Sequence, residues 1–199
     1  TAGLDLEGPL VVIDLSGIPD SASLGIVMTC AAAWQRAHIR GLLERADAAG
    51  RPAPKIINLL DEGSRFIGHL GTARWLQEAF KLVRGFGMQN VIVFHRLTDL
   101  QSAGGRDSQQ VRIAEGLISD TETRVIYGQS ADQVPVLRDV VATSETELEL
   151  IPQLGKGQAI WQVGRRSSLV QHRISPADRL ARPRTALQRQ HAQVSVPGL

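Results

Sequence analysis

Short apolar runs alternate along the chain with longer segments in which apolar residues recur at helical spacing. Runs rich in branched apolar residues predict strands at residues 9–18, 55–60, 90–95 and 123–128. Helical spacing predicts helices in the intervening segments, at residues 21–49, 72–84 and 109–118. Strands and helices that alternate in this way favour an α/β fold, in which a parallel sheet carries helices on both faces.

The following segment predicts two short helices. They cover residues 134–141 and 144–154, and the second opens with Ser144 followed three residues later by Glu147. This spacing is a capping-box pattern, in which the two side chains bond to each other's backbone N–H groups. We therefore place a helix start at Ser144.

The C-terminal part predicts a β-hairpin and a tail. Residues 157–174 carry two strands of mixed polarity that turn between Gly164 and Ser167. The chain after Pro176 is rich in arginine and glutamine and poor in apolar residues. We divide the protein into one domain at 1–175 and a basic, disordered tail at 176–199.

Composition changes this picture little. Of 199 residues 43% are hydrophobic and 21% charged, which is typical of a soluble globular protein. The formal charge of +2 is too small to indicate nucleic-acid binding by itself. The single cysteine, Cys30, lies in the apolar run "GIVMTCAAAW" and is interpreted as a small core residue of an intracellular protein. No apolar run approaches the roughly 20 residues of a transmembrane helix.

Acidic residues follow the predicted strands. In "KIINLLDEGSRFI" the strand ends in Asp61 and Glu62 and is followed at once by Gly63. Ligands of open parallel sheets bind beyond the carboxyl ends of the strands, so we expect Asp14, Asp61, Glu62 and His95 along one edge. Paired carboxylates at this place suit magnesium binding and activation of water. In the alternative, Asp61 caps the next helix and Glu62 is an ordinary helix-entry acid.

The order of several motifs resembles one family. "KIINLLDEGSRFI", "KLVRGFG", "NVIVFHRLTDL", "DTETRVIYGQ" and "SETELELIPQLGKGQAIWQVG" follow one another as in the C-terminal half of the motor domain of VirB4 and TraG-type ATPases. These enzymes of conjugation and type IV secretion belong to the HerA and FtsK superfamily. The resemblance spans Pro9 to Ser175 and implies a RecA-like fold, a hexamer, and ATP with Mg²⁺ as cofactors.

The resemblance also implies roles for individual residues. Asp61 would be the Walker B carboxylate that holds magnesium through water, and Glu62 would polarise the attacking water. Arg84 would contact a phosphate of the same or the neighbouring subunit. His95 stands where the family usually has a glutamine that senses the γ-phosphate. Arg124 matches a basic residue that follows a threonine, although a solvated arginine at a strand end explains it as well.

The chain lacks the glycine-rich loop G-x-x-x-x-G-K-[ST] that cradles nucleotide phosphates in such enzymes. Because the chain also begins at Thr1 without a methionine, we expect a motor domain that lacks its phosphate-binding strand. The isolated chain should then neither bind ATP tightly nor hydrolyse it. The missing strand should leave a groove in the sheet, which a second copy or the missing half would cover.

The leading hypothesis is part of a hexameric ATPase that powers transfer of DNA or protein through a secretion or conjugation machine. Its partners would be copies of itself and other components of the machine, with DNA as one possible cargo. Its place would be cytoplasmic, including a peripheral position at the inner face of the membrane. A second hypothesis is a degenerate docking module that does not hydrolyse ATP. A third is a receiver-like or flavodoxin-like domain that clusters Asp14 and Asp61.

Overall fold

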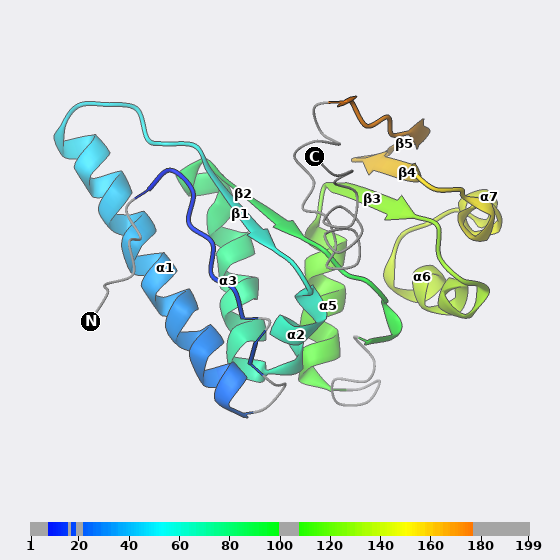
Figure 1. Cartoon of the computed structure of the whole chain (residues 1–199), viewed down its shortest axis with the longest axis horizontal. Helices are drawn as coiled ribbons and strands as arrows, with labels where there is room; N and C mark the ends of the chain where they lie inside the picture. Colours follow the sequence, from blue (N-terminus) through cyan, green and yellow to red (C-terminus); the bar gives the residue numbers. More distant parts are fainter. Residues whose placement is uncertain (1–7, 16, 19–21, 100–107, 177–199) are drawn as a thin grey trace, which may run out of the picture.

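The structure is a computed structural model that describes residues 8–15, 17–18, 22–99 and 108–176 (Figure 1). Most elements lie where the hydrophobic pattern predicts them, and the capping box of Ser144 and Glu147 is confirmed. In chain order the elements are α1 (Ala22–Ala48), β1 (Ile56–Leu60), α2 (Gly63–Gly68), α3 (Leu70–Phe86), β2 (Met88–Ile92), α5 (Gln109–Asp120), β3 (Thr123–Tyr127), η1 (Ala131–Gln133), α6 (Val134–Val140), α7 (Glu145–Leu150), η2 (Ile151–Gln153), β4 (Gln158–Val163) and β5 (Arg166–Gln171).

The strands form two separate sheets rather than one. β1 and β2 pair in parallel, whereas β3, β4 and β5 form an antiparallel sheet in the order β3-β4-β5. The prediction of one parallel sheet that includes the fourth strand is therefore wrong for the described residues. β3 finds its hydrogen-bond partners on β4, with Val125 opposite Trp161, and not on β2. The predicted hairpin is confirmed as β4 and β5.

The first predicted strand is absent from the described part of its range. Residues 8–15 form no strand, and Leu10 and Val12 are 81% and 77% exposed. An apolar run becomes a strand where a neighbouring strand satisfies its backbone N–H and C=O groups. In the described residues this run is not part of either sheet. The prediction of a buried strand is thus wrong here, because the run contains no information about a partner.

Helices cover one face of the parallel pair. On β1 the side chains of Asn58 and Leu60 are buried, whereas Ile57 and Leu59 on the opposite face are 70% and 65% exposed. α3 packs beside β2, with α1 and α5 on either side of it, as Figure 1 shows. The prediction of helices on both faces is therefore wrong for the described chain.

One hydrophobic core joins the two sheets. Strands of both sheets, β1 in one and β3 and β4 in the other, contribute side chains to the same buried cluster. The buried members from strands and helices include Leu60, Ile67, Leu76, Ile113, Leu117, Ile126, Leu137 and Ile160. The shared core fixes the position of β1 and β2 relative to the hairpin.

Helix α1 exposes Cys30, which the sequence analysis placed in the core. α1 buries Leu24, Met28 and Ala32, which recur every four residues on one stripe. Cys30 lies two residues from Met28, which is more than half a turn around the helix. Along the described ranges, no helix combines the length and the apolar character needed to cross a membrane.

Candidate functional site

The turn after β1 is packed tightly against the end of β2. The backbone N–H of Gly63 donates to the carbonyl oxygen of Val93 over 2.8 Å. A Cβ atom added at Gly63 would lie 2.4 Å from Cγ2 of Ile92 and 2.9 Å from Cε1 of Phe94. Contacts this short require neighbouring side chains to move. Glycine is therefore needed directly after the acidic pair, which explains the local sequence "DEG".

Glu62 has a strained backbone conformation. With φ 53° and ψ 49° it is left-handed, and it is the one non-glycine residue of the described ranges with positive φ. This conformation costs an L-residue roughly 1–2 kcal/mol. Its backbone N–H donates to Oδ1 of Asp61 over 2.9 Å, which stabilises the turn. Residues held in strained backbone conformations are often found at functional sites, so the observation directs attention to this carboxylate.

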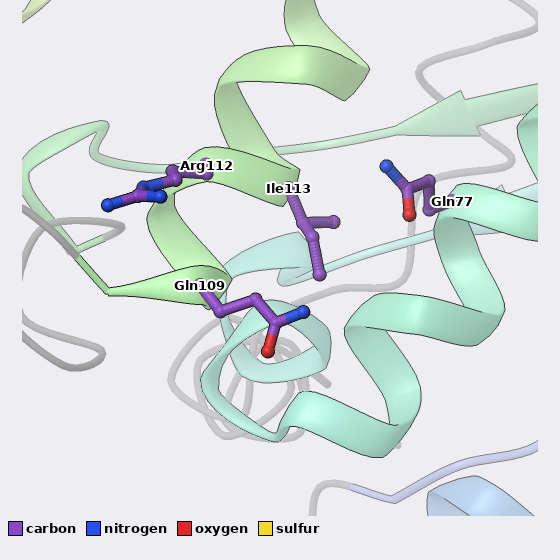
Figure 2. A pocket seen from close by; sticks show the side chains of 4 residues that line it. All are labelled: Gln77, Gln109, Arg112 and Ile113. Atoms are coloured by element: carbon purple, nitrogen blue, oxygen red, sulfur yellow. The ribbon is translucent and has the colours of Figure 1, made fainter.

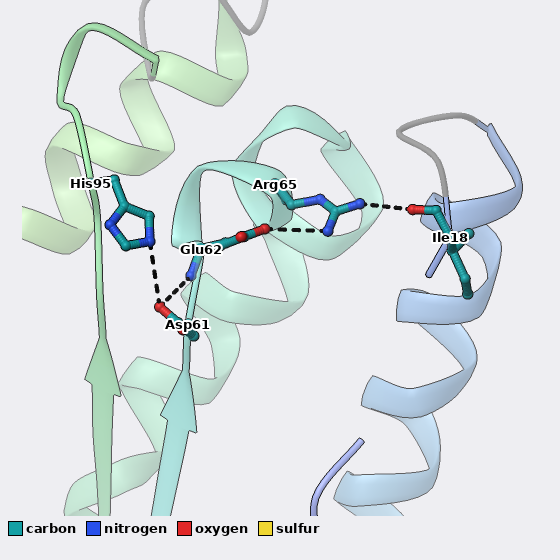
Figure 3. Close-up of polar contacts among 5 residues, drawn as sticks. All are labelled: Ile18, Asp61, Glu62, Arg65 and His95. Atoms are coloured by element: carbon teal, nitrogen blue, oxygen red, sulfur yellow. Dashed lines mark hydrogen bonds and ion pairs between the residues drawn. The ribbon is translucent and has the colours of Figure 1, made fainter. Parts of the chain in front are cut away.

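Three of the predicted residues gather at one edge of the parallel pair (Figure 3). Asp61 and Glu62 follow β1, and His95 belongs to the segment after β2. Nε2 of His95 lies 3.8 Å from Oδ1 of Asp61. Because the strands are parallel, their carboxyl ends meet at the same edge. The structure thus brings two carboxylates and an imidazole together on an exposed surface.

The sequence analysis missed Arg65, which belongs to the same cluster. Nη1 of Arg65 lies 3.2 Å from Oε2 of Glu62, and Nη2 donates to the carbonyl oxygen of Ile18 over 2.9 Å (Figure 3). Residues three apart on a helix are neighbours, so the spacing from Glu62 to Arg65 was the available signal. The pair ties Oε2 of the Glu62 carboxylate to α2.

Two predicted arginines are not brought to this edge. Arg84 lies near the end of α3, just before β2 begins, and its side chain lies outside the described residues. Arg124 lies near the start of β3, where its guanidinium donates to the carbonyl oxygen of Ile118 over 2.8 Å and to that of Ser119 over 3.2 Å. These carbonyls belong to the last turn of α5, where a cation is electrostatically favourable.

The donor set suits magnesium held through water. Oxygen ligands are those that Mg²⁺ prefers, and it usually keeps several of its water molecules. The carboxylate of Asp61 is exposed, and its contacts in the structure use Oδ1. Among the described residues no group of three or more His, Cys, Asp or Glu side chains could hold a metal directly. Asp61 therefore fits the water-mediated role better than a closed metal site.

A separate pocket opens between α3 and α5. It has a volume of about 510 Å³ and is lined by Gln77, Gln109, Arg112 and Ile113 (Figure 2). None of these residues belongs to the acidic cluster, by which we mean Asp61 and Glu62 with their neighbours Arg65 and His95. The candidate site is thus an exposed turn at a sheet edge and does not coincide with this pocket.

The chain is an α/β protein in which two carboxylates and an imidazole lie at the carboxyl edge of a pair of parallel strands. The solved structures that resemble this fold include VirB4 of Thermoanaerobacter pseudethanolicus, with a TM-score of 0.55 and 13% sequence identity. The likeness covers 63% of this chain and 33% of the VirB4 chain. No protein-family model matches the sequence, and neither does any curated protein. The likeness shows a shared fold, which agrees with the resemblance seen in the sequence.

Proposed function

We propose that this chain supplies the Walker B part of an ATPase that powers transfer of DNA or protein through a type IV secretion or conjugation machine. The observation that carries the proposal is the meeting of Asp61, Glu62 and His95 at the carboxyl edge of β1 and β2. The fold shared with part of VirB4 supports it.

Each residue has a role in this proposal. Asp61 would hold magnesium through water, and a bound ion would supply neutralisation of charge on the nucleotide phosphates. Glu62 orients the water molecule that attacks the γ-phosphorus and accepts the proton that this water releases. The bond between that phosphorus and the β–γ bridging oxygen then breaks, which yields ADP and phosphate. His95 donates a hydrogen bond toward the γ-phosphate, in place of the usual glutamine.

The phosphate-binding loop must come from outside this sequence. We propose that its strand enters between β2 and β3, because the two sheets are not hydrogen-bonded to each other. The exposed side chains of Ile57 and Leu59 support a further covering layer, since parallel strands are normally buried on both faces. The chain alone therefore neither binds ATP tightly nor hydrolyses it. The active form is a hexamer of the complete motor on the cytoplasmic side of the membrane.

One observation favours the alternative of a docking module without hydrolysis. The carboxylate of Glu62 is already paired with Arg65 at 3.2 Å. The contact with Arg65 engages Oε2, one of the two carboxylate oxygens with which Glu62 could orient a water molecule. If Arg65 keeps Glu62 paired in the complete motor, the chain would help to assemble the machine and would not turn over ATP.

One substitution separates the two functions. Glu62→Gln is made in the motor assembled with its phosphate-binding loop, and ATP turnover and nucleotide affinity are measured. Loss of turnover by about 100-fold or more with unchanged affinity supports the ATPase. The matched control is Glu115→Gln on α5, an exposed glutamate outside the acidic cluster, which should leave both values unchanged. Equal turnover in the wild type and Glu62→Gln would overturn the catalytic assignment.

A further inference from the structure

Gln133 is a polar residue buried in an unusual place. Its side chain is 2% exposed, yet it lies in the short helix η1 that follows β3. A buried amide is costly unless its donors and acceptor find partners. Two of the hydrogen bonds of the Gln133 side chain reach Thr98, in the segment that follows strand β2 of the other sheet. This residue therefore connects two parts of the chain far apart in sequence.

The connection is made by three hydrogen bonds. Oε1 of Gln133 accepts from the backbone N–H of Thr98 over 3.2 Å, and Nε2 donates to Oγ1 of Thr98 over 3.1 Å. Nε2 also donates to Oδ2 of Asp132 over 2.8 Å. Both ends of the amide are thus occupied, and two of the bonds reach the same residue. Such a two-point contact fixes the distance and the orientation of Thr98 relative to η1.

The segment held by Gln133 carries His95. We call residues 93–98 the strap, because they run from the end of β2 to Thr98. Phe94 and Leu97 pack against the core, whereas the side chain of His95 is exposed and contacts Asp61. Phe94 and Leu97 hold the strap by apolar packing, which does not fix its far end by hydrogen bonds. The bonds from Gln133 supply a polar anchor three residues beyond His95.

Charge supports the same arrangement. Asp132 is bonded by Ser130 and by Gln133, and Arg96 of the strap adds a favourable charge; together these lower the pKa of the Asp132 carboxyl. Arg96 follows His95 directly in the sequence. The strap is therefore attracted to η1 at Arg96 and bonded to it at Thr98, on the same side of His95.

We propose that Gln133 is a positioning residue that holds His95 beside Asp61 through the strap. The proposal deepens the proposed function, because it names the group that sets the geometry of the third member of the site. Gln133 touches neither carboxylate of the site, so it acts through Thr98 and not on the reacting atoms. Through Thr98 and the strap, η1 and the antiparallel sheet that precedes it are linked to the site at the edge of the parallel pair.

The test uses nuclear magnetic resonance on this chain and needs no ATP. In Gln133→Met the amide is lost at similar volume, and hydrogen exchange of the Thr98 amide should accelerate on the order of tenfold or more. The second readout is the change in the His95 ring signals caused by Asp61→Asn. That change should be clear in the wild-type background and at least halved in Gln133→Met.

Two further variants keep the test decisive. Thr98→Val removes the hydroxyl partner at similar size and should reproduce the loss, whereas Thr98→Ser keeps the hydroxyl and should retain the wild-type response. Gln153→Met is the control, since Gln153 is exposed and bonds to the carbonyl oxygen of Glu149. If Gln133→Met does not fold, the comparison of Thr98→Val with Thr98→Ser still shows whether the hydrogen bond to Thr98 positions His95.

An unchanged response of His95 in Gln133→Met and Thr98→Val would overturn the proposal. The same holds if Gln153→Met changes the response as much as Gln133→Met, because the effect would then be general. The outcome is separate from that of the proposed function. A motor in which Glu62→Gln leaves turnover unchanged would refute hydrolysis at this site, and the ring signals would still report whether Gln133 positions His95.

Discussion

Nε2 of His95 lies 3.8 Å from Oδ1 of Asp61, although the two side chains are 67% and 73% exposed. Exposed ion pairs contribute little to folding, so this contact has a weak structural reason to exist. We expect Asp61→Asn and His95→Gln each to change the free energy of unfolding by less than about 0.5 kcal/mol. Urea denaturation of the isolated chain measures this.

In the complete motor the same substitutions should behave differently. Asp61→Asn should reduce kcat/KM for ATP by about 100-fold or more, because the amide holds hydrated Mg²⁺ less well. His95→Gln restores the family's usual residue and should keep turnover within about tenfold of the wild type. A cost above about 1 kcal/mol in folding for Asp61→Asn would show that the carboxylate is structural.

The strained backbone of Glu62 gives a prediction of opposite signs for two glutamates. Glu62→Gly should raise the free energy of unfolding by about 0.5–1 kcal/mol, because glycine adopts the left-handed conformation without a steric penalty. Glu115→Gly, in the interior of α5, should lower it by about 1 kcal/mol. Thermal and urea denaturation of both variants measure the difference. A destabilised Glu62→Gly would mean that the Glu62 side chain is needed for folding.

Gly63 and Gly116 form a second pair with opposite expectations. Gly63→Ala should destabilise the fold by about 1–3 kcal/mol, because the new methyl group meets Ile92 and Phe94. Gly116 lies inside α5 with nothing within 4 Å of an added Cβ, so Gly116→Ala should stabilise by about 0.5–1 kcal/mol. The midpoints of urea denaturation measure both changes in stability, provided that the slope of the free energy of unfolding against urea concentration stays the same. Equal effects of the two substitutions would contradict the tight turn.

Glu147 should make stability depend on pH. Burial alone would raise the pKa of its carboxyl, but hydrogen bonds from Ser167, Ser144 and Gln162 outweigh it and lower the pKa below the ordinary 4.5. The unfolded chain then binds the proton more tightly than the folded one. The contribution of Glu147 is therefore complete above pH 4.5 and is lost as the pH falls through the lowered folded value.

The measurement is urea denaturation between neutral pH and about pH 3, in a range set by ordinary carboxyl pKa values. Glu147→Gln should cost about 1 kcal/mol at pH 7, since glutamine can still accept from the Ser144 N–H but the charge-assisted hydrogen bonds are lost. It should also flatten the acid side of the profile. Glu149→Gln on the same helix is the control, because its side chain is exposed. If the free energy of unfolding falls with pH as steeply in Glu147→Gln as in the wild type, Glu147 is not the cause of the acid-side loss of stability.

Local features of this protein could be predicted well from the sequence. The helix at α1, the hairpin of β4 and β5, and the cap at Ser144 depend on neighbours within a few residues or on a short turn. The edge that holds Asp61 and His95 could also be predicted, because both follow apolar runs that became parallel strands. The roles of Arg84 and Arg124 in catalysis stay predictions.

The sequence by itself determined most of the helical and extended segments and placed two carboxylates at a strand end, because periodicity and turn residues act locally. The tertiary structure decided which strands pair, and it left the first apolar run outside both sheets. It also gave Glu62 its partner Arg65 and joined Gln133 to Thr98. Hydrogen-bond partners far apart in sequence leave no periodic signal, so their identity depends on how the elements pack around the shared core.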